Sequence, residues 1–328
     1  MIFFEVIHFS EISTTLLWVL MFAGFTMLFF GGESLTQAAV GMAHKMNIPK
    51  VIIGLTVVSI ATSMPEMIAS LFGALQGNTG IAVGNLIGSN IANLGLILGL
   101  TTILLPLKIE ISLIKKEMPI LLLISTLFWV FAYDKRSIDT HEGIILLAIT
   151  FLYITYLYCS VTKGNPLENT TETFVTKVPV SWSRLISFLI LGSLGLAIGA
   201  DIVIQSAVEI AYRFGVSDFI IGITIIAFGT SCPELVTCVM AAIKKHPELV
   251  AGNVIGSNIF NLLLIGGTVS TITALPVKTQ WLRVELPLMI GITLLCWIFL
   301  YTKKEVSRIE GTVLLLSYLG AMIASILH

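Results

Sequence analysis

One segment that occurs twice decides the fold, as GLTVVSIATSMPEMIAS at 54–70 and as GITIIAFGTSCPELVTC at 222–238. A second pair follows, AVGNLIGSNIANLGLILG at 82–99 and VAGNVIGSNIFNLLLIGG at 250–267. Both pairs are 168 positions apart, and the two stretches that begin at 54 and 222 agree at 19 of 46 positions without a gap. The matches include Gly, Thr, Ser, Pro, Glu and Asn, so shared apolar composition does not explain them. The chain is therefore two copies of one design.

Composition indicates the class of protein. Of the 328 residues, 56% are hydrophobic and only 11% are charged, with a mean hydropathy of +0.99. Soluble domains average about 25% charged residues, so we expect an integral membrane protein. The 18 Lys and Arg nearly balance the 19 Asp and Glu, which leaves no basic surface for nucleic acid. The apolar runs have the length of about 20 residues that a spanning helix needs, which favours an all-α polytopic fold over a β-barrel.

Polar clusters, Pro and Gly divide the chain into ten predicted transmembrane helices. Their ranges are 13–43, 50–75, 80–105, 118–133, 141–162, 184–212, 217–243, 248–275, 285–302 and 309–327. The first run has no basic leader or cleavage site, so we interpret it as a retained span. The four cysteines stand singly in apolar runs and are interpreted as small buried residues.

The basic residues of the loops predict the orientation, because cytoplasmic loops carry the excess of Lys and Arg. One side of the predicted membrane holds 13 of them and the other side holds 5. Both termini are therefore expected outside, with the linker 163–183 in the cytoplasm and the chain in the cell (inner) membrane. Five spans in each copy is an odd number, so the second copy enters the membrane inverted. We expect two five-helix repeats, 1–162 and 184–328, of the kind that places a transport site at their interface.

Glu66 and Glu234 occupy equivalent positions deep within apolar runs. A carboxylate at membrane depth costs several kcal/mol and indicates a functional site. Pro65 and Pro233 precede them, and because Pro lacks an N–H it should kink each helix and free backbone carbonyls. Such irregular backbone is tolerated where it lines a cavity.

The second motif supplies Gly-Ser-Asn-x-x-Asn in each copy. Ser89 and Asn93 are one helical turn apart and share a face, as do Ser257 and Asn261. Hydroxyl, amide and carboxylate oxygens together suit hard cations such as Ca²⁺, Mg²⁺ or Na⁺. The five histidines fall in loops or near the ends of the chain, so softer metals are not favoured.

These paired motifs resemble the two alpha repeats of the sodium/calcium exchanger family, in the cation/Ca²⁺ antiporter superfamily, in its short ten-helix prokaryotic form. The resemblance covers essentially the whole chain. It implies that Na⁺ and Ca²⁺ bind alternately at Glu66 and Glu234 and are exchanged across the membrane. It also implies that ten residues complete the site by side chain or backbone: Ser59, Thr62, Ser63, Ser89, Asn93, Ala227, Thr230, Ser231, Ser257 and Asn261. The long first and sixth helices resemble the sliding gate of the family.

The chain departs from the family pattern at a few positions. Ala61 stands where the family usually has Gly, and Ala92 replaces the bulky residue matched by Phe260. Some relatives carry Asp where this chain has Asn93 or Asn261. With two carboxylates the site carries a charge of −2, which one Ca²⁺ or two Na⁺ would balance, so a third Na⁺ or a K⁺ is not implied.

Other interpretations compete with this one. Two buried carboxylates could instead couple Ca²⁺ or another divalent cation to H⁺. An enzyme is not favoured, because no intramembrane nucleophile has a His partner, and no cofactor or obligate protein partner is indicated. Asn90 and Asn258 face a different side of their helices and are interpreted mainly as packing residues. Glu33 and Asp201 are interpreted as helix-packing or gating residues.

Overall fold

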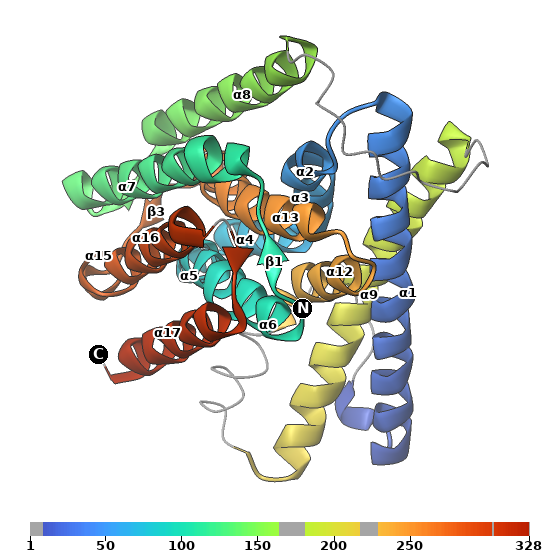
Figure 1. Ribbon diagram of the computed structural model, residues 1–328. Coiled ribbons are helices and arrows are strands. Elements are labelled where there is room, and N and C mark those ends of the chain that lie inside the picture. The colour runs from blue at the N-terminus through green and yellow to red at the C-terminus, as the bar shows by residue number, and fades with distance from the viewer. Residues whose placement is uncertain (1–8, 164–180, 217–228, 304, 328) are drawn as a thin grey trace.

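The structure is a computed structural model that describes residues 9–163, 181–216, 229–303 and 305–327. Within these ranges it is a bundle of helices with four short strands (Figure 1). The first half contains η1 (Phe9–Glu11), α1 (Thr14–Met46), α2 (Lys50–Ile53), η2 (Gly54–Val58), α3 (Ser59–Thr62), α4 (Met64–Leu75), α5 (Thr79–Ala92), η3 (Asn93–Ile97), α6 (Leu98–Leu104), β1 (Leu107–Lys108), η4 (Leu113–Glu117), α7 (Met118–Lys135), β2 (Ser137–Ile138) and α8 (Thr140–Lys163). The second half contains α9 (Trp182–Arg213), α12 (Cys232–Ile243), α13 (Pro247–Phe260), η6 (Asn261–Ile265), α14 (Gly266–Ile272), β3 (Leu275–Pro276), α15 (Thr279–Arg283), α16 (Glu285–Lys303), β4 (Glu305–Val306) and α17 (Arg308–Leu327).

By length and apolar composition, six of the described helices could cross a membrane. A seventh is added if the bent pair Lys50–Thr62 and Met64–Leu75 counts as one span. The predicted eighth span is too long, because its helix ends at Ile272 and Thr273 turns into extended backbone. The first part of the predicted span 217–243 lies outside the described residues up to 228, and α12 forms its remainder.

The proline prediction is confirmed in the second span. The helix breaks at Ser63, Pro65 lies in the first turn of α4, and the two parts are bent by 42°. The ring of Pro65 has no N–H for the carbonyl of Ala61, so that carbonyl loses its helical partner. Pro233 likewise lies in the first turn of α12.

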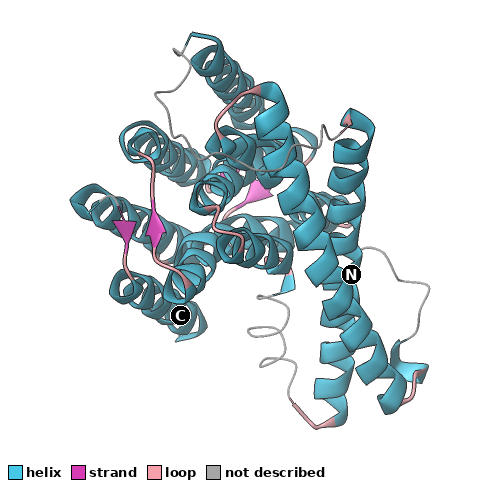
Figure 2. Cartoon of the chain, turned by 45° about the vertical axis from the view of Figure 1, so that its right-hand side comes forward, coloured by secondary structure: helices cyan, strands magenta, loops and turns pink. Residues whose placement is uncertain are grey.

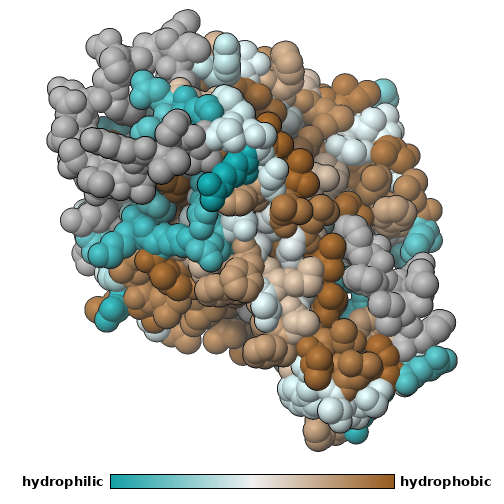
Figure 3. Space-filling view, turned by 90° about the vertical axis from the view of Figure 1, so that its right-hand side faces the viewer, coloured by the Kyte–Doolittle hydropathy of each residue, from teal (hydrophilic) through white to brown (hydrophobic). Residues whose placement is uncertain are grey.

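The motif-bearing helices form the centre of the bundle (Figure 1). In the continuous helix Pro247–Ile272, 94% of the most apolar stretch is buried, and in Thr79–Leu104 the share is 78%. The corresponding shares for α1 and α9 are only 28% and 33%, so these helices lie at the outside. Helix α1 exposes aromatic side chains along its length, among them Trp18, Phe22 and Phe25. Hydrophobic atoms dominate much of the described surface on this side (Figure 3).

Helices α1 and α9 pack antiparallel as a long pair, which Figure 2 shows extending past the other helices. Glycines make this contact close: a Cβ placed on Gly31 would lie 2.9 Å from the Gly192 carbonyl oxygen. A Cβ on Gly24 would lie 2.9 Å from the Gly199 carbonyl oxygen. Gly24 and Gly192 are 168 positions apart, as are Gly31 and Gly199. Exchanging equivalent residues of the two halves therefore converts the Gly31–Gly192 contact into the Gly199–Gly24 contact.

The same exchange recurs elsewhere in the bundle. Strands β1 and β4 pair antiparallel with Leu107 opposite Val306, and β2 and β3 pair antiparallel with Ile138 opposite Leu275. The indole N–H of Trp129 donates to the Leu282 carbonyl oxygen at 3.0 Å, and that of Trp297 to the Ile114 carbonyl oxygen at 2.9 Å. In each case an offset of 168 converts one contact into the other.

Candidate ion-binding site

Glu66 and Glu234 lie in the first turns of α4 and α12, directly after the two backbone breaks. Ser63 and Ser231 adopt similar non-helical angles at those breaks, with φ and ψ of −84° and 3° and of −92° and 6°. Each glutamate is only 1% exposed. Because the first turn of a helix presents unpaired N–H groups and the positive end of its dipole, it is a favourable place for a buried carboxylate.

The two carboxyl groups face each other. Their charges interact directly, and the hydroxyl of Ser63, three residues before Glu66, donates to Glu234 Oε1 at 3.0 Å. The remaining oxygens, Glu66 Oε2 and Glu234 Oε2, are buried and have no hydrogen-bond partner among the described residues. The predicted convergence of the two glutamates is therefore what the structure shows.

The amide-bearing segments cross between the halves. Helix α4 contacts η6, and α12 contacts η3, so each glutamate helix touches the segment that begins with the asparagine of the other half. Both segments are π-helices, whose wider turns occur mostly as short bulges at functional sites. This crossing brings Asn261 and Asn93 to the same region as the carboxylates.

Several polar atoms here are buried without a hydrogen-bond partner in the part of the chain that the structure describes. Besides the two carboxylate oxygens they are Ser231 Oγ, Ser257 Oγ, Asn93 Oδ1, Asn258 Nδ2, Asn261 Oδ1 and Asn261 Nδ2. Buried polar atoms normally find partners, so this concentration calls for a ligand. Most of these atoms are oxygens, which are the ligands that hard cations prefer.

The other predicted ligands differ in how closely the structure supports them. Thr62 is buried, and its hydroxyl lies 3.3 Å from both the Ser59 carbonyl oxygen and Asn253 Oδ1. The Ser59 hydroxyl donates to the Leu55 carbonyl at 2.8 Å, so any ligand from Ser59 would be its backbone. Thr230 is partly exposed, and Ala227 lies outside the described residues.

Sequence reasoning missed two asparagines and gave Asn258 mainly a packing role. Asn258 does bond between helices, because its Oδ1 accepts a hydrogen bond from Asn93 Nδ2 at 3.1 Å, and this contact also places it beside a predicted ligand. Asn90, its counterpart, does bond within its own helix, to the Leu86 carbonyl at 2.7 Å. Asn85 and Asn253, which precede Ser89 and Ser257 by one turn, contact predicted ligands. Their spacing of four residues from each serine was the available signal.

The charge of the site is small. The described residues contain no group of three or more His, Cys, Asp or Glu side chains that could hold a metal ion. Glu66 and Glu234 thus supply the formal charge, and the neutral Ser, Thr and Asn groups supply the remaining oxygens. Glu33 and Asp201 lie outside this set: Glu33 pairs with Lys244 at 2.7 Å, and Asp201 accepts from Gln205 at 2.8 Å.

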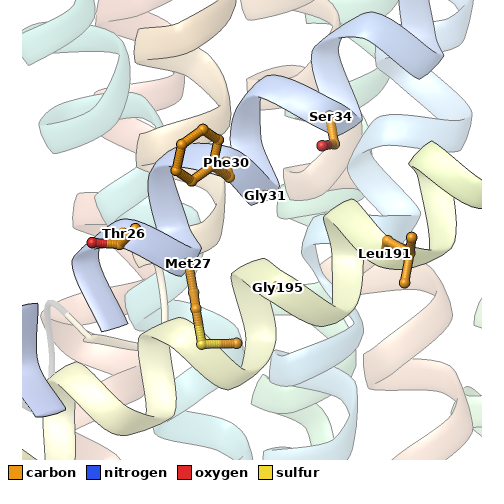
Figure 4. A pocket seen from close by; sticks show the side chains of 7 residues that line it. All are labelled: Thr26, Met27, Phe30, Gly31, Ser34, Leu191 and Gly195. Atoms are coloured by element: carbon orange, nitrogen blue, oxygen red, sulfur yellow. The ribbon is translucent and has the colours of Figure 1, made fainter. Parts of the chain in front are cut away.

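A separate hollow lies between α1 and α9 (Figure 4). Its volume is about 300 Å³, and it is open to the surface. It is lined by Thr26, Met27, Phe30, Gly31, Ser34, Leu191 and Gly195, none of which is a predicted ligand. The hollow is therefore separate from the predicted ion site.

Comparison with known proteins gives consistent matches. The family model described as "Sodium/calcium exchanger protein" matches residues 16–161 and 184–327. The sodium/calcium exchanger MaX1 of Methanosarcina acetivorans is 32% identical, with coverage of 94% of this chain and 98% of the relative. The inner membrane protein YrbG of Escherichia coli is also 32% identical, with coverage of 85% and 88%. A solved structure of the sodium-calcium exchanger NCX_Mj superposes with a TM-score of 0.80 at 30% identity, covering 96% of this chain and all of that one.

Proposed function

Because this chain belongs to the sodium/calcium exchanger family and is an integral membrane cation/Ca²⁺ exchanger, we propose that it exchanges Na⁺ for Ca²⁺ across the cell membrane. The observation that carries this proposal is the meeting of Glu66 and Glu234 with a set of buried, unpartnered oxygens. The transported ions are its substrates. It needs no cofactor or obligate protein partner and catalyses no covalent reaction.

The charge of the site sets the competition between the two ions. Two carboxylates carry −2, which one Ca²⁺ or two Na⁺ neutralise. The ligands would be the twelve residues named from the sequence, led by Glu66 and Glu234, with Asn258 as an added neighbour of Asn93. Since an unneutralised carboxylate pair is costly to bury, only loaded forms of the site would move readily between the two sides.

The proposed architecture is ten transmembrane helices in two inverted repeats. Residues 1–162 form one repeat and 184–328 the other, joined by the cytoplasmic linker 163–183. The contacts that recur with an offset of 168 support it, because an in-plane twofold axis relates contacts in this way. The glycine-lined contact of α1 with α9 suits the sliding gate, which would move against the central helices and expose the site to each side in turn.

Coupling to H⁺ is the second candidate. The direct approach of the Glu66 and Glu234 carboxyl groups favours it, because two facing carboxyls can share a proton. The neutral Ser, Thr and Asn ligands do not discriminate between Na⁺ and H⁺ as the coupling ion.

The test is ⁴⁵Ca²⁺ uptake into proteoliposomes preloaded with Na⁺ at constant pH. Matched vesicles hold K⁺ or choline, and a further set carries an imposed pH gradient. Uptake that requires the outward Na⁺ gradient supports Na⁺/Ca²⁺ exchange. Uptake driven only by the pH gradient would replace it with proton coupling, and no uptake under any gradient would contradict both.

A further inference from the structure

Asn85 and Asn253 form another pair with the offset of 168, outside the ligand set proposed above. Each stands one helical turn before a serine ligand, Ser89 or Ser257, and therefore on the same face of its helix. Asn253 is 1% exposed and Asn85 is half-buried. Neither side chain is needed for α5 or α13 to form a helix. The contacts that the two asparagines make with residues of the site therefore indicate another role.

The amide nitrogens tie two helices together in each half. Asn85 Nδ2 donates to Ser70 Oγ at 2.9 Å and to the Glu66 carbonyl oxygen at 3.2 Å. Asn253 Nδ2 donates to Cys238 Sγ at 3.4 Å. Ser70 and Cys238 each lie one turn after the glutamate of their helix. The orientation of each asparagine amide is thus fixed by the helix that carries a glutamate.

The amide oxygens then point at hydroxyl groups of predicted ligands. The Ser89 hydroxyl donates to Asn85 Oδ1 at 3.2 Å. The Thr62 hydroxyl has two acceptors, each at 3.3 Å: Asn253 Oδ1 and the Ser59 carbonyl oxygen. A hydroxyl that binds a cation must offer a lone pair and direct its proton elsewhere. A fixed acceptor behind the hydroxyl does this, as partners behind metal ligands commonly do.

We propose that Asn85 and Asn253 are positioning residues that take the hydroxyl protons of Ser89 and Thr62 and so turn the lone pairs of these hydroxyls toward the cation. This inference rests on the proposed function, in which Ser89 and Thr62 bind the transported ion. The two asparagines differ in reach. Asn85 acts within the first half, whereas Asn253 on α13 acts on a ligand of the other half and links the two.

The test is equilibrium ⁴⁵Ca²⁺ binding to the purified full chain in detergent. Asn85→Ala and Asn253→Ala should each raise the Kd by about tenfold or more, the usual effect of removing a partner behind a metal ligand. Asn90→Ala is the matched control, because Asn90 lies on the same helix as Asn85 and its amide nitrogen donates to a backbone carbonyl of that helix. Its Kd should stay near that of the wild type.

Asp variants separate loss of the acceptor from loss of the fold. Asn85→Asp and Asn253→Asp keep an oxygen that accepts the hydroxyl proton, so they should bind Ca²⁺ better than the Ala variants, with Asn90→Asp correcting for the added charge. The inference would be overturned if Asn85→Ala and Asn253→Ala had the same Kd for Ca²⁺ as the control Asn90→Ala. It would also be overturned if the Asp variants bound Ca²⁺ as weakly as the Ala variants. Ca²⁺ binding does not depend on the coupling ion, so failure of Na⁺-driven uptake leaves this test intact, whereas a wild type that binds no Ca²⁺ overturns both.

Discussion

Each glutamate of the site combines a favourable position with an incomplete environment. The first turn of a helix favours its charge, yet Glu66 Oε2 and Glu234 Oε2 lack hydrogen-bond partners among the residues described. Two facing carboxylates with unfilled oxygens are stabilised by a divalent cation between them. Under the proposed function the site is therefore built around the ion rather than around its own hydrogen bonds.

Glu66→Gln should abolish Ca²⁺ flux while leaving folded protein. Removing one unit charge beside the ion costs about 4 kcal/mol at an effective dielectric of 20, so a loss of at least about 100-fold is expected. Proteoliposome ⁴⁵Ca²⁺ uptake measures it, and size-exclusion chromatography checks the fold. Glu209→Gln, which removes an ion pair with Arg213 at 2.8 Å on α9, is the control and should transport normally. Normal flux from the purified Glu66 variant would refute the site assignment.

Asn261→Asp tests the charge of the site. The amide oxygen and nitrogen of Asn261 are both buried without a hydrogen-bond partner in the described structure, so the new carboxylate would face the proposed ion site directly. We expect a steeper Na⁺ dependence of exchange or a change in its electrogenicity, because a site with a formal charge of −3 needs another positive charge to be neutralised. Flux against Na⁺ concentration and the current through a planar membrane measure these. If neither changes, Asn261 has a structural role only.

At the scale of elements, packing explains what residue patterns did not predict. The spacing of Ser257 and Asn261 predicts that they share a face. It could not predict that Asn258 would meet Asn93, because α13 is almost wholly buried and every face of it meets some helix. The side of α13 that meets Asn93 is decided by where η3 packs against it. This is a tertiary contact, and the local sequence of α13 does not encode it.

Gly31→Ala should weaken the pairing of α1 with α9. The added Cβ would lie 2.9 Å from both the Gly192 carbonyl oxygen and the Leu196 nitrogen, which are backbone atoms that cannot rotate away. Overpacking of this kind costs about 1–3 kcal/mol, so thermal stability and exchange rate should both fall. Gly291→Ala on α16 meets nothing within 4 Å and serves as the control. Equal melting temperatures for the two variants would show that the glycine contact is not tight.

At the scale of the molecule, the sequence supported the general class of fold and the two equivalent motifs, because a long duplication is visible in the residues themselves. The contacts that exchange the halves, such as those of Trp129 and Trp297, needed the structure. Each joins residues more than 150 positions apart, and the local sequence around either residue does not predict which distant residue it contacts.

The orientation in the membrane can be tested with single cysteines. Cys159 is the only partly exposed cysteine among the four, so a Cys159→Ser background leaves three buried thiols. Lys135→Cys should react with a membrane-impermeant maleimide in intact cells, because Lys135 is exposed on the side predicted to face outward. Lys116→Cys, exposed on the predicted cytoplasmic side, should react only after the cells are opened. The reverse pattern would place both termini inside.

Two of the four π-helical segments that the structure describes also carry information about the history of the chain. They span Asn93–Ile97 and Asn261–Ile265, equivalent places in the two halves. A π turn contains one residue more than an α turn, so both halves carry the same insertion at the same point. One insertion in a single ancestral half accounts for both, whereas two later insertions would have to coincide. The widened turn is then older than the doubling of the gene, and a half-length relative that assembles from two separate copies should carry it too.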